Sequence, residues 1–435
     1  MFEELDKILI SHNQPDFKKR LEKLRYEIMR EAWFLPSDKR RRQVIEILKE
    51  VKKRGDEAIV EYTKKFDLVE LTPEQFKVSE ENLEKAHKEI DKDLLSSIRQ
   101  SIENVRKYQK EIFTGRFKHP GIKYTPIESV GICIPGASAP LPSTVIMTAV
   151  PAQVADVEMI VVVSPPRYKD SIHPTILAVC YELGIDEVFR IGGAQAVAAL
   201  AFGTQTIRPV DKIVGPGNQW VQTAKREVFG IVGLDSIAGP SEVLIIANDK
   251  ANPAWVAADM LSQAEHDPGS AVMFTDSQKL AERVLAEVKK QLERLDRKEG
   301  TKRCLLEFSK IVVFNNVEDM TSAANDFAPE HLEIQCGEKS REIADKIENA
   351  GAIFIGDYSP VAVGDYWAGP SHTLPTGMTA RFFSALSAND FIKSTSIIEY
   401  SKEQLAKSAE DIIRLAEAEG LDAHAKSVKI RQVDT

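Results

Sequence analysis

The stretch EVFRIGGAQAVAALAFG, residues 187–203, combines two patterns of apolar residues. A short run of apolar and aromatic side chains is followed by two glycines, and then by a longer alanine-rich segment. The first part is typical of a strand and the last part of a helix, so the stretch predicts one strand–turn–helix unit. Because the apolar run is nearly continuous, the strand is expected to be buried on both faces, as in a parallel sheet.

The same alternation continues on both sides of this stretch. SVGICIPG, EMIVVVSPP and DKIVGPG read as further strands, and TILAVCYELG reads as a helix. The pattern resumes after residue 240 with SEVLIIAN, SAVMFTDS, KIVVFNN and GAIFIGD, separated by helices that begin at Pro253 and Gln278. The sequence therefore predicts an α/β fold with two tandem Rossmann-like parallel-sheet units. No GxGxxG follows any of these strands, so the usual dinucleotide fingerprint is absent.

The two ends of the chain have a helical pattern instead. Val44, Leu48 and Val51 recur on one helix face before Gly55, and residues 405–416 repeat that spacing before Gly420. We predict a helical N-terminal region over 1–115, Rossmann-like units over 116–240 and 241–380, and a helical tail over 381–435. The tail is too short for a core of its own, so it is expected to pack on another part of the fold or on a second subunit.

Composition limits the classes of partner. The 435 residues include 57 Lys and Arg against 66 Asp and Glu, a net charge of −9, which argues against a general nucleic-acid binder. The apolar segment from Ser143 to Val163 is interrupted by proline and acids, so it is not expected to span a membrane. The acidic N-terminus lacks a signal-peptide pattern, and four cysteines without a CxxC pair suit a reduced compartment. The sequence therefore predicts a soluble, cytoplasmic protein.

Glycine and proline gather in four loops near the strands: IPGASAPLPST, IGGAQ, VGPGNQW and IAGPSE. The loops that follow parallel strands are the usual ligand sites of such sheets, and glycine lets a backbone approach a ligand closely. These loops suit a nucleotide-like cofactor, but tight strand-to-helix turns are an equally ordinary use of glycine.

The segment LSQAEHDP, residues 261–268, ends the helix that begins at Pro253. Gln263 and His266 are three residues apart, so both side chains would share one helix face and could bind the same ion. The alternative is a plain helix end, where a histidine is favoured by the helix dipole. Two ligands do not complete a site, and Asp365 and His424 are the best remote candidates. Such a set suits zinc or a similar divalent ion.

A second candidate lies in NDFAPEHLEI, residues 325–334. Pro329 is expected to open a new helical turn, in which Glu330 and His331 would point about 100° apart. They would then serve two sides of a cleft, the histidine as a base for an alcohol and the glutamate as a base for water. A charged first turn without any catalytic role explains the same residues.

The motifs together resemble those of histidinol dehydrogenase. They occur in the order typical of that family, and the resemblance runs from RGDEAIVEYTKKFD to the C-terminus. After the IPGASAPLPST loop come GGAQAVAALAFGT, DKIVGPGN, AGPSEVL, LSQAEHDP, FAPEHLEI, VGDYWAGPSHTLPT and AEGLDAHAKSV. Several long motifs in one order are far more specific than any one of them.

The resemblance implies a zinc-dependent enzyme that oxidises L-histidinol to L-histidine through L-histidinal and reduces two NAD⁺. It further implies a homodimer whose active sites are shared across the subunits. Its zinc ligands would be Gln263, His266, Asp365 and His424, and its catalytic pair Glu330 and His331. The implied substrate contacts are Ser241, Gln263, His266, His331, Asp365, His372, Glu419 and His424. The implied cofactor contacts are Cys133, Gln195 and Asn218.

Two positions depart from the family pattern. Cys133 stands where an aromatic residue is common, and Ser371 stands before His372 where asparagine is commoner. The first puts the cofactor contact in doubt and the second a substrate contact. Related enzymes act on other small amino alcohols or on sulfonated diols, and Glu419 favours an imidazole substrate. A metal-dependent hydrolase and a catalytically silent binding protein are the alternatives from other classes.

Overall fold

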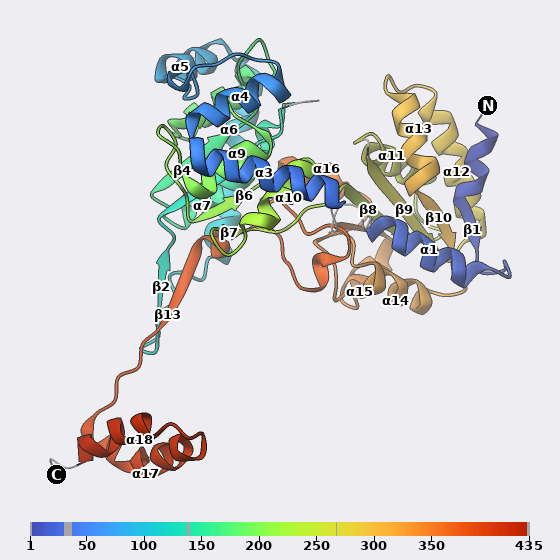
Figure 1. The fold of residues 1–435 in the computed structure, drawn as a ribbon. Coiled ribbons are helices and arrows are strands. Elements are labelled where there is room, and N and C mark those ends of the chain that lie inside the picture. Colours follow the sequence, from blue (N-terminus) through green and yellow to red (C-terminus); the bar gives the residue numbers. More distant parts are fainter. Residues whose placement is uncertain (1, 30–36, 137–139, 267, 433–435) are drawn as a thin grey trace. The chain divides into compact units, whose positions relative to one another are not determined.

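The computed structural model describes residues 2–29, 37–136, 140–266 and 268–432 (Figure 1). Asp267 of LSQAEHDP and residues 137–139 of the IPGASAPLPST loop lie outside the described residues. The chain divides into two compact units. The first comprises Met1–Thr114 and Pro126–Ile392, and the second comprises Gly115–Thr125 and Lys393–Thr435. Both predicted parallel sheets lie in the first unit.

The first sheet has five parallel strands within the described residues, in the order β5-β4-β3-β6-β7. The chain runs from β3 outward to β4 and β5, then returns to the other side of β3 for β6 and β7. The direction of winding therefore reverses between β3 and β6, which is where doubly wound folds bind ligands. The strands are β3 (Ser129–Cys133), β4 (Met159–Val163), β5 (Glu187–Phe189), β6 (Lys212–Val214) and β7 (Gly233–Leu234).

Helices cover both faces of the first sheet, as the apolar strands predicted. Val130 and Ile132 pack into one core with α5, α6, α7 and α8, whereas Cys133 and Val163 pack into another with α3, α4, α9 and α10. The helices of the first core are α5 (Glu80–Glu89), α6 (Lys92–Ile112), α7 (Pro142–Val154) and α8 (Pro174–Glu182). Those of the second are α3 (Asp38–Arg54), α4 (Asp56–Asp67), α9 (Gly193–Phe202) and α10 (Gln219–Val228).

The second sheet has six parallel strands in the described part of the chain, in the order β1-β10-β9-β8-β11-β12. Its edge strand β1 comes from the N-terminus and pairs Leu9 with Ile311 (Figure 1, dark blue). Three residues are too few for a recognisable period, so this strand was not predicted. The strands are β1 (Leu9–Ser11), β8 (Ser241–Ala247), β9 (Gly269–Thr275), β10 (Lys310–Val313), β11 (His331–Gln335) and β12 (Ala352–Ile355).

Two cores cover the second sheet as well. One face packs on α11 (Pro253–Ala264), α12 (Gln278–Leu292) and α13 (Lys298–Phe308). The other face packs on α1 (Phe17–Met29), α14 (Val317–Phe327) and α15 (Ser340–Ala344). The prediction of two Rossmann-like parallel-sheet units is therefore confirmed. The domain boundaries at 115, 240 and 380 remain a prediction.

Two local predictions were wrong. Glu330 and His331 do not open a helical turn, because His331 begins the buried strand β11. Helix α11 ends at Ala264, so His266 lies beyond it and does not share a helix face with Gln263. The chain has to turn at once into β9, where Gly269 lies so close to Gln263 that a Cβ would be 2.1 Å from the Gln263 carbonyl oxygen.

The second unit holds the C-terminal helices α17 (Lys402–Ala418) and α18 (Asp422–Lys429). Strands β2 (Ile122–Pro126) and β13 (Ile392–Ser396) form a two-stranded sheet at its junction with the first unit. The buried side chains of the two helices are alanines, while Leu415 and Ile430 are each 68% exposed. Among the described residues, none of the helices combines the length and hydropathy needed to cross a bilayer.

Strand β11 has one apolar and one polar face, and both are buried. Leu332 and Ile334 join the core on the α14 side, whereas His331, Glu333 and Gln335 alternate with them. Gln335 Nε2 donates to Glu333 Oε2 at 3.1 Å and to Asp259 Oδ2 of α11 at 2.8 Å. Burial, together with the neighbouring Asp259 carboxyl, raises the pKa of Glu333 to about 8. The two acids therefore retain a proton at neutral pH.

This buried pair predicts that the protein loses stability as pH rises from about 4.5 to about 8. Over that range the unfolded chain releases a proton that folded Glu333 keeps, which costs up to about 1.4 kcal/mol per pH unit. Glu333→Gln should flatten the slope, as measured by urea unfolding at several pH values. Glu338→Gln, at an exposed acid, is the control. Equal slopes for wild type and Glu333→Gln would contradict the prediction.

Candidate active site

Several of the predicted site residues gather at the amino ends of β8 and β11. Ser241 is the first residue of β8, and His331 is the first residue of β11. The two strands are parallel neighbours with His331 opposite Val243, so Glu330 and His331 lie beside Ser241 and Glu242. The loops after the carboxyl ends of the strands were expected to carry the ligands. This cluster lies at the other end, where the strands begin.

The ring of His331 is held by a backbone carbonyl. Its Nδ1 lies 3.0 Å from the carbonyl oxygen of Glu242. A carbonyl only accepts hydrogen bonds, so Nδ1 carries the proton in this contact and Nε2 is the atom available for chemistry. Nε2 is buried, has no hydrogen-bond partner among the described residues, and lies 3.6 Å from Oδ1 of Asp365.

Opposite charges around His331 control its protonation. Burial alone would lower the pKa of His331, but the carboxylates of Glu330 and Asp365 outweigh burial and raise it well above its usual value. Asp365, on α16 (Val361–Tyr366), behaves in the complementary way. Burial would raise the pKa of Asp365, but His331 first, and then His372 and His266, bring it below its usual value. The charges of three histidines therefore act on one carboxylate.

Glu330 is linked to Gln263 through a serine hydroxyl. Ser241 Oγ donates to Glu330 Oε2 at 2.7 Å and accepts from Gln263 Nε2 at 2.6 Å. The backbone N–H of Glu242 donates to the same glutamate oxygen at 2.8 Å. Glu330 Oε1 makes no hydrogen bond to the residues that the structure describes, so it is the oxygen left to act on a ligand.

His372 and Ser371 connect the cluster to the first sheet. Nε2 of His372 lies 3.3 Å from Oγ1 of Thr144, near the start of α7. Burial lowers the pKa of His372 against the opposing charge of Asp365, so the ring is neutral at pH 7. Ser371 is buried and donates to the carbonyl oxygen of Met147 at 2.9 Å. Ser371, one of the two residues that depart from the family pattern, thus donates a hydrogen bond to a backbone oxygen.

The predicted metal ligands have donor atoms that suit zinc: an amide oxygen, a carboxylate and two imidazoles. Gln263 uses its amide nitrogen on Ser241, so the carbonyl oxygen is the end that remains for a metal. Gln263, His266 and Asp365 belong to the first unit, whereas His424 and Glu419 are exposed residues of the second. Within the described ranges no three His, Cys, Asp or Glu side chains are placed as a metal-binding group. The ligand set therefore remains a prediction.

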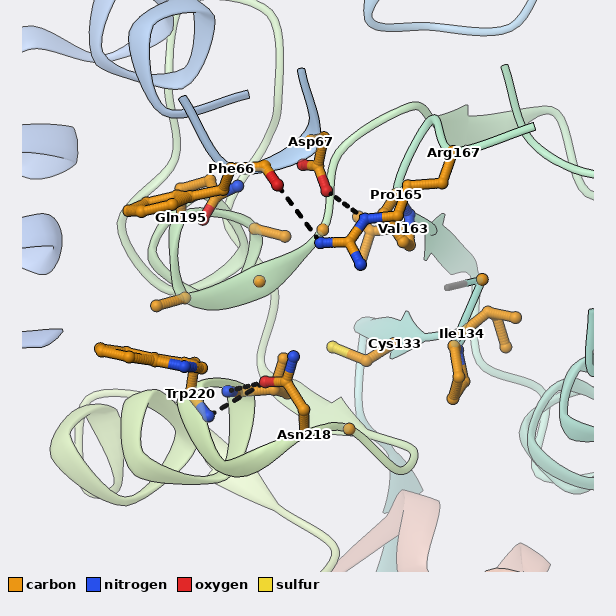
Figure 2. A pocket seen from close by; sticks show the side chains of 18 of the residues that line it. Phe66, Asp67, Cys133, Ile134, Val163, Pro165, Arg167, Gln195, Asn218 and Trp220 are labelled. Carbon is orange, nitrogen blue, oxygen red and sulfur yellow. Dashed lines mark hydrogen bonds and ion pairs between the residues drawn. The ribbon is translucent and has the colours of Figure 1, made fainter. Parts of the chain in front are cut away.

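A cavity of about 460 Å³ opens at the carboxyl ends of the first sheet (Figure 2). It lies at the reversal between β3 and β6, and the residues after β3, β4, β5 and β6 line it. Cys133, Gln195 and Asn218, predicted far apart in sequence as cofactor contacts, all lie on its wall. Burial raises the pKa of the Cys133 thiol to about 12, so this residue is neutral in the cavity wall.

A buried ion pair between Lys225 and Asp235 fixes the loop that contains Asn218. Lys225 Nζ lies 2.5 Å from Asp235 Oδ1 and donates to the carbonyl oxygen of Gly215 at 3.0 Å. Asp235 Oδ2 accepts from the N–H of Gly215 at 2.7 Å. Gly215 has a φ of +101° and lies so close to Cys133 that a Cβ would be 2.5 Å from its carbonyl oxygen, so no other residue fits.

Sequence reasoning missed several residues at both places. Phe66, Asp67, Arg167 and Trp220 line the cavity but were not singled out. Arg167 follows a predicted strand in VVVSPPR, a position with a known role in nucleotide folds, and this signal could have found it. Glu242, which positions His331 through its carbonyl oxygen, carries no signal of its own because any residue supplies that atom.

Comparison with known proteins gives the family of the chain. The family model for histidinol dehydrogenase matches residues 35–432. A histidinol dehydrogenase of Bacillus subtilis is 46% identical and aligns over 91% of this chain and 94% of its own length. One from Geobacillus kaustophilus is 45% identical over the same shares of the two chains. The crystal structure of histidinol dehydrogenase from Elizabethkingia anophelis superposes with a TM-score of 0.85 at 37% identity, covering 90% of this chain and 92% of that one.

A match along almost the whole chain, to relatives of nearly the same length, covers both sheets and the tail together. The chain therefore belongs to the histidinol dehydrogenase family, whose members are oxidoreductases of histidine biosynthesis.

Proposed function

We propose that the protein oxidises L-histidinol to L-histidine through L-histidinal, with the reduction of two NAD⁺ and with a bound zinc ion. The observation that carries the proposal is the orientation of His331. Its Nδ1 is committed to the carbonyl oxygen of Glu242, so its buried Nε2 is the atom that can act as a base. The carboxylates of Glu330 and Asp365 favour the imidazolium form, so the ring gives up its Nε2 proton before Nε2 accepts one from the substrate. Among the described residues, no atom makes a hydrogen bond with Nε2.

In the first oxidation, Nε2 of His331 accepts the hydroxyl proton of histidinol while the carbon-bound hydrogen leaves as hydride to the nicotinamide. Loss of the proton and the hydride converts the alcohol to the aldehyde. Glu330, whose Oε2 lies 3.4 Å from Nδ1 of His331, stabilises the imidazolium that forms.

In the second oxidation, Oε1 of Glu330 takes a proton from water as the water oxygen attacks the aldehyde. His331 releases its first proton to solvent and then deprotonates the hydroxyl of the resulting hydrate as a second hydride leaves, which yields the carboxylate. Ser241 and the N–H of Glu242 hold Oε2 of Glu330 throughout, so the free oxygen stays aimed at the substrate. The same two side chains, Glu330 and His331, therefore provide the bases for both oxidations.

Gln263, His266, Asp365 and His424 would hold the zinc ion, and Cys133, Gln195 and Asn218 would contact NAD⁺. When bound, the ion would supply a Lewis acid that helps to orient the substrate. Ser241 and His372 would contact the substrate alongside these ligands. Glu419 would accept a charge-assisted hydrogen bond from the substrate imidazole. That last contact favours histidinol over other amino alcohols and over sulfonated diols.

We also propose that the protein is a homodimer in which the tail contributes Glu419 and His424 to the partner subunit's site. The tail supports this because its helices bury little but alanine and leave Leu415 and Ile430 largely exposed. Large apolar side chains in this state usually mark a surface that another chain covers.

The two members of the catalytic pair should differ in their effects when each is replaced. His331→Asn is expected to lower kcat by about 10²–10⁴-fold, the usual contribution of a general base, without loss of NAD⁺ binding. Glu330→Gln should slow hydration of the aldehyde, so that the yield falls from two NADH per histidinol toward one. Both are measured from nicotinamide absorbance at limiting histidinol. Unchanged turnover in His331→Asn would remove it from the mechanism.

Removing a ligand should release the metal. Asp365→Ala and His424→Ala are each expected to lower zinc content and activity together, as measured by elemental analysis of the dialysed protein. Asp422→Asn changes an exposed acid two residues from His424 and should keep its zinc. Full zinc in both ligand variants would refute the assignment.

Shared sites should allow complementation. If the tail serves the partner, then mixing His424→Ala with Glu330→Gln under subunit exchange forms hybrids with one intact site. Random exchange should restore about a quarter of the wild-type rate of histidine formation, which neither variant supports alone. A mixture that stays inactive although mass spectrometry shows hybrid dimers would place each site within one chain.

A further inference from the structure

The rim of the cavity in the first sheet carries an ion pair between two distant segments (Figure 2). Asp67 is the last residue of α4, and Arg167 lies four residues beyond the end of β4. Arg167 donates from Nε to Oδ1 of Asp67 at 2.7 Å and from Nη2 to the carbonyl oxygen of Phe66 at 3.4 Å. Both charged side chains line the cavity in which NAD⁺ is proposed to bind.

The position of Arg167 has a defined meaning in nucleotide-binding folds. β4 is the strand that follows β3 in the chain and lies beside it in the sheet. In doubly wound folds the residue after this strand recognises the ribose of adenosine, where an acid binds the 2′-hydroxyl and an arginine accommodates a 2′-phosphate. Taken alone, Arg167 would favour NADP⁺.

Asp67 changes that preference. Its side chain is only 3% exposed, and its first oxygen is occupied by Arg167. Its second oxygen, Oδ2, is buried and has no hydrogen-bond partner among the described residues, although such atoms are normally paired. A ribose hydroxyl would supply the missing donor, whereas a 2′-phosphate would bring a second anion against the carboxylate.

The aromatic residues indicate which part of a dinucleotide lies here. Figure 2 shows Phe66 beside Asp67 on one wall of the cavity and Trp220 on the opposite wall. Both rings are partly exposed, although the Phe66 ring also lies parallel to Tyr62 and beneath the Lys65 ammonium. A flat heteroaromatic base between two such walls, with its ribose toward Asp67, suits the adenosine half of the cofactor.

We propose that Asp67 is the specificity-determining residue for the dinucleotide: it binds the ribose 2′-hydroxyl and neutralises Arg167, so that the cavity accepts NAD⁺ and rejects NADP⁺. The carboxylate thus comes from a helix of the N-terminal region instead of from the strand that usually provides it. This inference rests on the proposed use of a dinucleotide.

Two small probes test the proposal without metal or histidinol. Adenosine 5′-monophosphate and adenosine 2′,5′-bisphosphate differ only in the 2′-phosphate, and calorimetry gives their Kd values directly. Wild type should prefer the monophosphate. Asp67→Asn should weaken the monophosphate and strengthen the bisphosphate, because Arg167 is released, shifting the ratio of Kd values by about tenfold or more. Glu57→Gln, at an exposed acid on the same helix, should leave the ratio unchanged.

Arg167 provides the second arm of the experiment. Arg167→Gln leaves Asp67 without its counter-charge and should increase the preference for the monophosphate, which keeps the proposal testable if Asp67→Asn does not fold. The double variant should lose the gain in bisphosphate affinity. A folded Asp67→Asn variant that binds NAD⁺ with the wild-type ratio of probe affinities would overturn the role of Asp67. Wild-type protein that binds neither NAD⁺ nor either probe would overturn the proposed dinucleotide site itself.

Discussion

The parallel register between β8 and β11 is the constraint on which the candidate active site depends. It sets His331 opposite Val243, so that the carbonyl oxygen of Glu242 meets Nδ1 of His331 while Ser241 meets Glu330. A slip of one residue would exchange the faces of β11, since side chains alternate along a strand. Leu332 and Ile334 would then face the polar side of α11. Burial of both faces therefore fixes the register, and the register orients the base.

The two sheets have the same parallel architecture, but their candidate sites lie at opposite ends of the strands. The first opens a cavity at the carboxyl ends of its strands, where glycine-rich turns bring backbone close to a ligand. The second gathers its ionisable side chains at the amino ends of β8 and β11. The polar contact between Thr144 and His372 connects a helix of the first sheet to the cluster of the second. Under the proposed function, the cavity of the first sheet would take the cofactor and the cluster of the second would take the alcohol.

Most of the fold could be predicted from sequence, because each long strand is a continuous apolar run and each helix carries its own period. β11 was missed because Pro329 followed by Glu330 resembles the start of a helix, although HLEIQ alternates polar and apolar residues as a strand does. At the candidate site, the residue types of Glu330, His331 and Asp365 indicated chemistry, and family motifs brought them together. Their geometry could not be predicted, since it depends on a backbone oxygen of Glu242 and on a strand pairing 88 residues apart in the chain. The pair of Asp67 and Arg167 joins segments 100 residues apart, a contact that no local pattern encodes.

The N-terminal edge strand has a consequence for synthesis on the ribosome. β1 emerges among the first residues, yet its partner β10 follows about 300 residues later. At typical elongation rates the strand waits roughly 15–60 s before it can pair. During that time Leu9 and Ile10 have no strand with which to pair. Once β10 has been made, its outer backbone groups stay unpaired until β1 joins it. The edge of the second sheet is therefore completed by a strand made long before its partner, and loss of β1 would leave the hydrogen-bonding edge of β10 exposed to other chains.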